Sequence, residues 1–156
     1  MRHNFVADAL AVHLKKVGTV LSNTDGKRKE KKTGVDKDRP GDVVVTWSTA
    51  SGPETFFIDI TVSHMHICNS IDDYRTNHIE KAVANKRKKY YGKLDHRVVP
   101  FGMTSSGELS TDTWALIDEL ATRLQAINNQ KNNKRVIMRS LSCALQKGNA
   151  IMLCAH

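Results

Sequence analysis

The sequence has few of the features that mark secreted or membrane-spanning proteins. Three cysteines among 156 residues, Cys68, Cys143 and Cys154, are too few and too scattered for a disulfide framework. No run approaches the roughly 18 apolar residues that a membrane-spanning helix requires. The first ten residues lack the basic-then-apolar order of a secretory signal. We therefore expect an intracellular protein of a reducing compartment that does not associate with membranes.

Acidic residues are also scarce relative to basic ones. The chain has 24 lysines and arginines against 16 aspartates and glutamates, which gives a net charge of +8. A basic excess favours a polyanionic partner, most often nucleic acid, although an ordinary basic surface is the alternative. The apolar content of 40% and charged content of 26% are typical of a globular protein. We expect a single domain over residues 1–156.

Hydrophobic periodicity predicts a mixture of helices and strands. The predicted helices cover residues 4–17, 71–92, 111–127 and 133–147, the last resuming past Gly148 within a C-terminal helical segment at 130–156. The predicted strands cover residues 19–23, 42–47, 55–62 and 97–103. This order indicates an α/β (α+β) fold, a small mixed sheet flanked by helices. Asn4 is the expected N-cap of the first helix, and Pro100 should place its strand at an edge.

Three local patterns qualify this scheme. The helix at 111–127 carries an apolar stripe, Trp114, Ile117, Leu120, Leu124 and Ile127, and should end at Asn128 and Asn129. The Ser/Thr/Gly loop at 103–110 precedes that helix, where it could cap the helix or hold a phosphate through backbone N–H groups. Residues 23–41 form a basic loop with the run "KRKEKK", either a solvated linker or a segment that contacts DNA.

Two carboxylates fall on the predicted hairpin. In "FFIDITVSHMH", residues 56–66, Asp59 lies within an apolar strand, where a charge is costly unless it is paired or bound to a metal. If residue 47 pairs with residue 54 across a six-residue loop, Asp42 lies opposite Asp59 on the same face. Like charges repel there, so a divalent cation such as Mg²⁺ could compensate them. An accidental pair is the alternative.

The basic helix that follows could supply a cation to this pair. Ala82, Lys86, Lys89, Tyr90 and Lys93 share one helical face, and Ala82 would permit close approach to the sheet. Lys86 or Lys89 could then reach over the sheet edge towards the carboxylates. A metal that activates a water, with a lysine that stabilises charge on phosphate, makes a phosphodiester-cleaving site.

Five segments in the same order resemble a known family. They are "RHNFVADALAVHLKKVG", "RPGDVVV", "FFIDITVSH", "AVANKRKKYY" with "VVPFGMTSSGELS", and "SLSCALQKGNAIML". Together they resemble the restriction-like endonuclease domain of non-LTR retrotransposons, a branch of the P-D…(D/E)-x-K nuclease superfamily, over roughly residues 2–152. The resemblance implies a restriction-endonuclease-like core and a Mg²⁺- or Mn²⁺-dependent endonuclease that nicks or cleaves duplex DNA.

The resemblance also implies roles for individual residues. Asp42 and Asp59 would be the metal ligands. Thr61 stands where the superfamily commonly has its lysine, and Lys86 and Lys89 with Tyr90 match the pattern in which that lysine comes from the next helix. His3, Thr61 and His64 are possible lining residues of the site; phosphate contact and capping are both open for His3, and a solvent-exposed histidine at the strand end is the alternative for His64. Positive charge, rather than the resemblance, leads us to expect DNA contacts from Lys27, Arg28, Lys29, Lys31, Lys32, Arg87, Lys88 and Lys93. A solvated basic face is the alternative for Arg87 and Lys88.

The expected partners follow from the same family. They are duplex DNA in the nucleus or another intracellular compartment and a reverse transcriptase within a longer polyprotein; the chain is either an excised domain or a free-standing relative. A homodimer is compatible with the sequence. The alternative function is an inactive nucleic-acid-binding module that keeps the nuclease fold.

The match departs from the family pattern in two places. Gly41 separates Pro40 from Asp42, and Asp36 and Asp38 lie close enough upstream to be the first ligand instead. A separate alternative is a zinc site made by His64, His66, Cys68 and His78, although their spacing is not a usual zinc-finger pattern.

Overall fold

The mixed fold predicted from the periodicity is confirmed in the computed structural model. The structure describes residues 2–22, 41–64, 78–90 and 97–154. The elements follow in the order α1 (Arg2–Leu14), β1 (Gly18–Ser22), β2 (Val43–Thr49), β3 (Gly52–Ser63), α3 (His78–Tyr90), β4 (Arg97–Thr104), α4 (Thr111–Asn128) and α5 (Asn133–Cys154). This is the predicted order of helices and strands. Among the described helices, none is long and apolar enough to cross a membrane.

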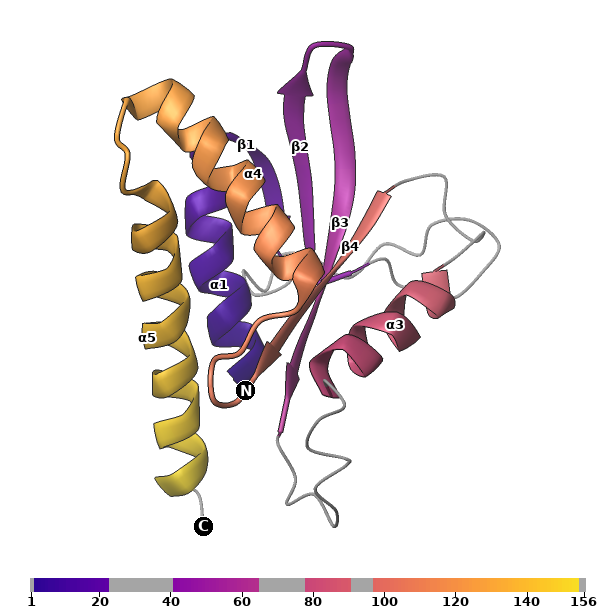
Figure 1. Cartoon of the computed structure of the whole chain (residues 1–156), viewed down its shortest axis with the longest axis vertical. Helices are drawn as coiled ribbons and strands as arrows, with labels where there is room; N and C mark the ends of the chain where they lie inside the picture. The colour runs from indigo at the N-terminus through magenta and orange to yellow at the C-terminus, as the bar shows by residue number, and fades with distance from the viewer. Residues whose placement is uncertain (1, 23–40, 65–77, 91–96, 155–156) are drawn as a thin grey trace.

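The four strands form one mixed sheet in the order β1-β2-β3-β4. The first two pairings are antiparallel and the last, between β3 and β4, is parallel. Parallel neighbours need a crossover connection, and the segment containing α3 makes it. As predicted, β4 is an edge strand, with Pro100 opposite Asp59. Figure 1 shows α3 on one side of the sheet and α1, α4 and α5 on the other.

The main core lies between the sheet and the three helices α1, α4 and α5. Alternate residues of β3 face it, namely Phe56, Ile58 and Ile60, all at most 2% exposed. The other strands add Val43, Val45, Trp47, Val99, Phe101 and Met103. The helices close the core with Leu10, Leu14, Leu116, Ile117, Leu120, Ile137, Leu141 and Leu145, among others. The apolar residues that alternate along the strands and those that recur at helical spacing therefore pack into the same layer.

Among the helices that the structure describes, α3 is the one that covers the opposite face of the sheet. Ile79 and Val83 are buried, and a Cβ added to Gly102 of β4 would lie 2.6 Å from Val83 Cγ2 and 2.9 Å from Ile79 Cγ1. Gly102 is thus the residue that allows close approach of the helix. Ala82, which the sequence suggested for this role, is partly buried, and the close contact with β4 is made by its neighbours Ile79 and Val83.

The ends of α4 agree with the sequence, whereas its buried stripe agrees only in part. Ser110 is the N-cap, and Asn129 ends the helix in the left-handed conformation at φ 54°. Trp114 and Ile127 are 39% and 65% exposed, so their predicted burial is wrong. Thr113 is buried instead, because its Oγ1 accepts a hydrogen bond from Gly102 N at 2.8 Å and donates one to Gly102 O at 3.0 Å.

The two terminal helices differ from their predicted bounds. α1 begins at Arg2 and ends at Leu14, so Asn4 lies within the helix and is not its N-cap. α5 continues through Gly148 without a break. A Cβ on Gly148 would lie 2.8 Å from Arg2 Cα, so the glycine lets α1 pack closely on α5. This packing explains a glycine in a helix interior, where it is otherwise unfavourable.

The hairpin between β2 and β3 is longer than predicted but has the predicted register. Trp47 pairs with Glu54, which confirms the expected pairing. The ladder then continues to Thr49 opposite Gly52, so the expected six-residue loop is wrong. Gly52 has φ 118°, a conformation that favours glycine at the tight turn.

Candidate active site

The hairpin register places Asp42 beside Asp59. Val43 pairs with Ile58, and Asp42 directly precedes Val43 in the chain. The Asp42 amide donates to Ile58 O at 2.8 Å, and Asp42 Oδ2 accepts a hydrogen bond from Ile60 N at 2.8 Å. Asp42 is therefore fixed to the backbone on both sides of Asp59.

Gly41 makes this arrangement possible. Its φ is +75°, and a Cβ at this position would lie 2.7 Å from Ile58 O. A residue with a side chain would be strained and would also clash with the backbone of β3. The glycine that interrupts the family-like pattern between Pro40 and Asp42 thus lets the chain approach β3 just before the carboxylate.

Asp59 is buried, with 5% of its surface exposed, and both of its oxygens are engaged. Lys86 Nζ lies 2.8 Å from Oδ1, and Tyr90 donates its hydroxyl to Oδ2 at 2.8 Å. Lys86 keeps 30% of its side chain exposed, so the ion pair opens to solvent on the lysine side. A buried carboxylate requires such partners, and α3 supplies both of them.

Of the two lysines that the sequence offered, only Lys86 contacts Asp59. Lys89 is exposed, and its Nζ lies 3.2 Å from the Tyr90 hydroxyl and 4.8 Å from the centre of the Tyr90 ring. Lys89 therefore contacts Tyr90 rather than Asp59. α3 is oriented about its axis so that Ile79, Val83 and Tyr90 are buried. This orientation places Lys86, and not Lys89, next to Asp59.

His3 joins the site from the other layer of the fold. Its Nε2 lies 2.8 Å from Asp42 Oδ2. This hydrogen bond is the main reason why the pKa of His3 is raised above 6.5, since burial acts in the opposite direction. Burial alone would raise the pKa of Asp42, but the hydrogen bonds from His3 and Ile60 N, with the charges of His3 and Lys86, hold it below 3.8.

Thr61 and His64 follow Asp59 along β3. Thr61 is partly buried and pairs with Gly102, and no lysine occupies that position. His64 is exposed, and its Nε2 contacts the guanidinium of Arg2. From the start of α1, Arg2 therefore contacts the residue after β3, and His3 contacts the residue before β2.

Several predicted residues fall elsewhere. Arg87 pairs with Asp112 of α4, and Lys88 is exposed. The basic loop at 27–32, with Lys27, Arg28, Lys29, Lys31 and Lys32, lies outside the described residues, as do Asp36, Asp38, His66, Cys68 and Lys93. Within the described ranges, no group of three histidines, cysteines or carboxylates could hold a metal ion.

The loop at 103–110 is occupied by protein contacts. The Ser110 hydroxyl accepts from Thr113 N, and Glu80 of α3 accepts from Thr111 N at 2.6 Å and Thr111 Oγ1 at 2.8 Å. Of the two functions open to this loop from sequence, the structure shows helix capping. The contacts also tie α3 to the start of α4.

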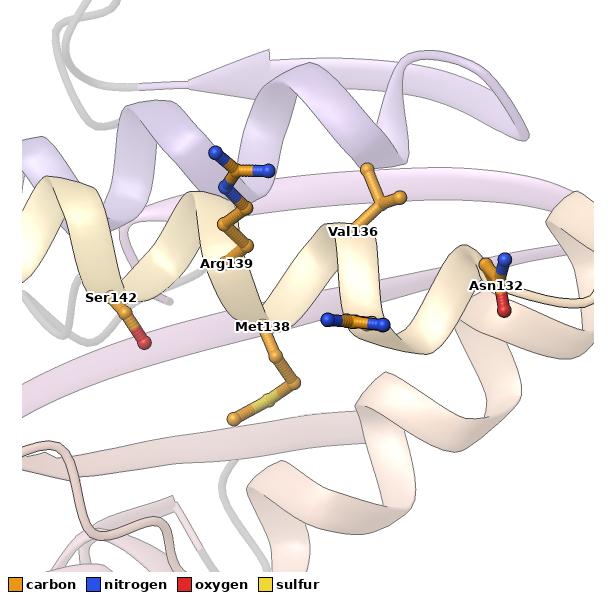
Figure 2. A pocket seen from close by; sticks show the side chains of 6 residues that line it. Asn132, Val136, Met138, Arg139 and Ser142 are labelled. Atoms are coloured by element: carbon orange, nitrogen blue, oxygen red, sulfur yellow. The ribbon is translucent and has the colours of Figure 1, made fainter.

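A pocket of about 550 Å³ lies apart from the carboxylates, on α5 (Figure 2). Its lining is Asn132, Arg135, Val136, Met138, Arg139 and Ser142, none of which the sequence singled out. The pocket belongs to the layer of helices on the side of the sheet opposite α3.

Comparison with known proteins adds no relative. The chain matches no protein-family model, and a search of curated proteins finds no match.

Proposed function

We propose that the chain is a divalent-metal-dependent DNA endonuclease with a restriction-endonuclease-like core. The group of Asp42, Asp59 and Lys86 supports this proposal most directly. Asp42 directly precedes β2, Asp59 lies on β3, and Lys86 belongs to the crossover helix α3. This is the set that the resemblance to retrotransposon nucleases requires, with the lysine on the helix. The basic excess of the chain is in keeping with a DNA substrate.

The donor set suits Mg²⁺ or Mn²⁺. Both carboxylates are hard oxygen ligands, and Mg²⁺ typically takes one or two carboxylates together with waters and substrate phosphates. Each carboxylate has about four acceptor sites, so the bonds to Lys86, Tyr90, His3 and Ile60 N do not exhaust the pair. When bound, a divalent cation would supply Lewis-acid polarisation of a phosphoryl oxygen and easier deprotonation of water.

The protein's own groups would then position this chemistry. Lys86 lies at the solvent-facing side of Asp59, where its ammonium can stabilise charge that develops on a phosphate. Tyr90 holds Asp59 Oδ2 and thereby fixes the orientation of the carboxylate. His3 and the Ile60 amide do the same for Asp42.

Nicking of supercoiled plasmid in Mg²⁺ or Mn²⁺ tests the proposal. Asp59→Asn preserves the shape of the side chain but removes a metal ligand, so we expect nicking to fall about 10³-fold, corresponding to several kcal/mol of transition-state stabilisation. Asp42→Asn should reduce nicking by a similar factor. Wild-type nicking rates in Asp59→Asn would refute the assigned site.

The same assay identifies the working lysine. Lys86→Met should reduce nicking by about 10², more than Lys89→Met, because only Lys86 contacts Asp59. Lys81→Met is the matched control, since it removes the same charge from an exposed position of α3. A larger loss in Lys89→Met than in Lys86→Met would contradict the assignment.

A second function is favoured by the way the carboxylates are already compensated. Lys86 and Tyr90 engage both oxygens of Asp59, and His3 is held near Asp42 in a setting that favours its charged form. A module that binds nucleic acid without cleaving it would need no cation here. Wild-type protein that shifts duplex DNA in a gel, takes up no Mn²⁺ by calorimetry and leaves plasmid intact would establish this alternative.

A further inference from the structure

Two basic side chains, Arg2 and His64, meet just beyond the end of β3, five residues after Asp59. The guanidinium of Arg2 contacts Nε2 of His64, and among the described residues no carboxylate forms an ion pair with Arg2. Arg2 Nε is also buried without a hydrogen-bond partner in the described part of the chain. A buried donor without a partner is unfavourable, so the guanidinium of Arg2 has hydrogen-bonding capacity that its described contacts leave unused.

The packing of α1 fixes the position of this arginine. Gly148 of α5 leaves room for Arg2, whose Cα would lie 2.8 Å from a Cβ at that position. The neighbouring residue His3 bonds to Asp42. His64 follows Asp59 by five residues of nearly extended chain, which is a separation of about 16 Å. The Arg2–His64 pair is thus built into the fold within reach of the candidate active site.

We propose that Arg2 and His64 form a subsite for a backbone phosphate of the bound DNA. Arginine matches phosphate geometry through its planar set of donors, and a histidine ring nitrogen can add a further donor. DNA rises 3.4 Å per nucleotide along each strand, so the phosphate lies within about five nucleotides of the bond that is cut. This inference rests on the proposed function, because it places a contact to the same DNA.

The experiment measures how binding depends on salt, without any cleavage. The dissociation constant for a 20-base-pair duplex is measured by fluorescence anisotropy in EDTA at a series of KCl concentrations. A lost phosphate contact lowers the slope of log K against log salt by about 0.9. We expect this change in Arg2→Gln, with about tenfold weaker binding at low salt.

Three further variants separate contact from structure. Arg2→Lys should restore most of the slope, and Arg2→Gln with His64→Gln should have the slope of Arg2→Gln alone, since both residues hold one phosphate. Arg135→Gln is the charge-matched control, about 20 Å along α5 from Gly148. An unchanged slope in Arg2→Gln, with only a lower melting temperature, would show a purely structural role and overturn the subsite. An equal fall in slope in Arg135→Gln would also overturn it.

The outcome is separable from that of the proposed function. If the wild type never nicks plasmid but Arg2→Gln lowers the slope, the endonuclease proposal fails and the phosphate subsite stands. If the wild type nicks and Arg2→Gln binds with an unchanged slope, the subsite fails and the endonuclease proposal stands. A wild type that does not bind the duplex would overturn the subsite.

Discussion

The two faces of β3 differ in what covers them. Phe56, Ile58 and Ile60 face three helices and belong to the main apolar core. Asp59 faces a single helix, α3, and is held by two specific side chains, Lys86 and Tyr90. One face is therefore maintained by apolar packing, whereas the other adds directional contacts to the carboxylate of Asp59.

This difference teaches where the fold can tolerate change. Apolar packing is non-directional, so an apolar side chain of the main core can be replaced by another of similar volume at a modest cost in stability. The α3 face combines apolar packing of Ile79 and Val83 against Gly102 with two hydrogen-bonded contacts, from Lys86 and Tyr90, that orient the Asp59 carboxylate. The main apolar core and the contacts to Asp59 thus lie on opposite sides of one strand, and substitutions on the two sides should differ in their effects.

The largest effect on stability is expected on the core face. Ile58→Ala removes a fully buried side chain and should reduce the free energy of unfolding by about 2–5 kcal/mol. Its neighbour Asp59→Asn should cost less, about 1–2 kcal/mol, because the loss is that of a charged hydrogen bond. Urea denaturation followed by circular dichroism measures both. A greater loss of unfolding free energy in Asp59→Asn than in Ile58→Ala would contradict the expected difference between the two faces of β3.

An intermediate effect is expected where the backbone brings the carboxylates together. Gly41→Ala adds left-handed strain of about 1–3 kcal/mol and a clash with Ile58 O. Gly52→Ala is the matched control, since its φ is also positive but nothing lies within 4 Å of its Cβ. We expect Gly41→Ala to unfold more easily than Gly52→Ala, by about 1–2 kcal/mol. Only Gly41→Ala should also displace Asp42 and lower plasmid nicking.

Equal stabilities of the two glycine variants would show that the close approach at Gly41 is unimportant. Equal nicking rates per folded molecule would show that Gly41 does not position Asp42. The two measurements therefore test the contact and its consequence separately.

The smallest effect is a pH dependence within the core layer. Burial, aided by the charge of Lys16, lowers the pKa of His13 below 6.5. The unfolded chain thus takes up a proton at higher pH than the folded one. The contribution of His13 to stability is complete above pH 6.5 and decreases as the pH falls towards the folded pKa, below which the loss no longer grows.

His13→Gln should remove this loss of stability at acidic pH. Because His3 has a raised pKa and contributes with the opposite sign, the quantity to compare is the difference in urea-unfolding free energy between variant and wild type from pH 5 to pH 8. A difference that does not vary with pH would contradict the assigned burial effect.

The sequence predicted the sheet well because its signals are local. Alternating apolar residues define the strands, and counting back from the turn pairs Trp47 with Glu54 and so brings Asp42 beside Asp59. The stripe of α4 was predicted correctly at Ile117, Leu120 and Leu124 but not at Trp114 and Ile127. Thr113 is buried by hydrogen bonds to the β4 backbone at Gly102, which hydrophobicity does not report.

The candidate site was predicted only as far as residue types allow. The carboxylates and the basic helix were named, but the choice between Lys86 and Lys89 depends on the rotation of α3, which Ile79, Val83 and Gly102 set through packing. The contact of His3 with Asp42 was predicted only as a lining role, since no spacing rule connects the start of α1 with the start of β2.

The contact of Arg2 with Gly148 also has a kinetic consequence. It joins the first and last described helices, so the chain closes its longest loop to make it, and loop closure of this kind is entropically costly. The strand pairs β1-β2 and β2-β3 join neighbours in sequence and can form earlier. We expect the hairpins to precede the docking of α1 on α5 during folding. We therefore expect Arg2 and His3 to reach His64 and Asp42 late in folding, after the strands have paired.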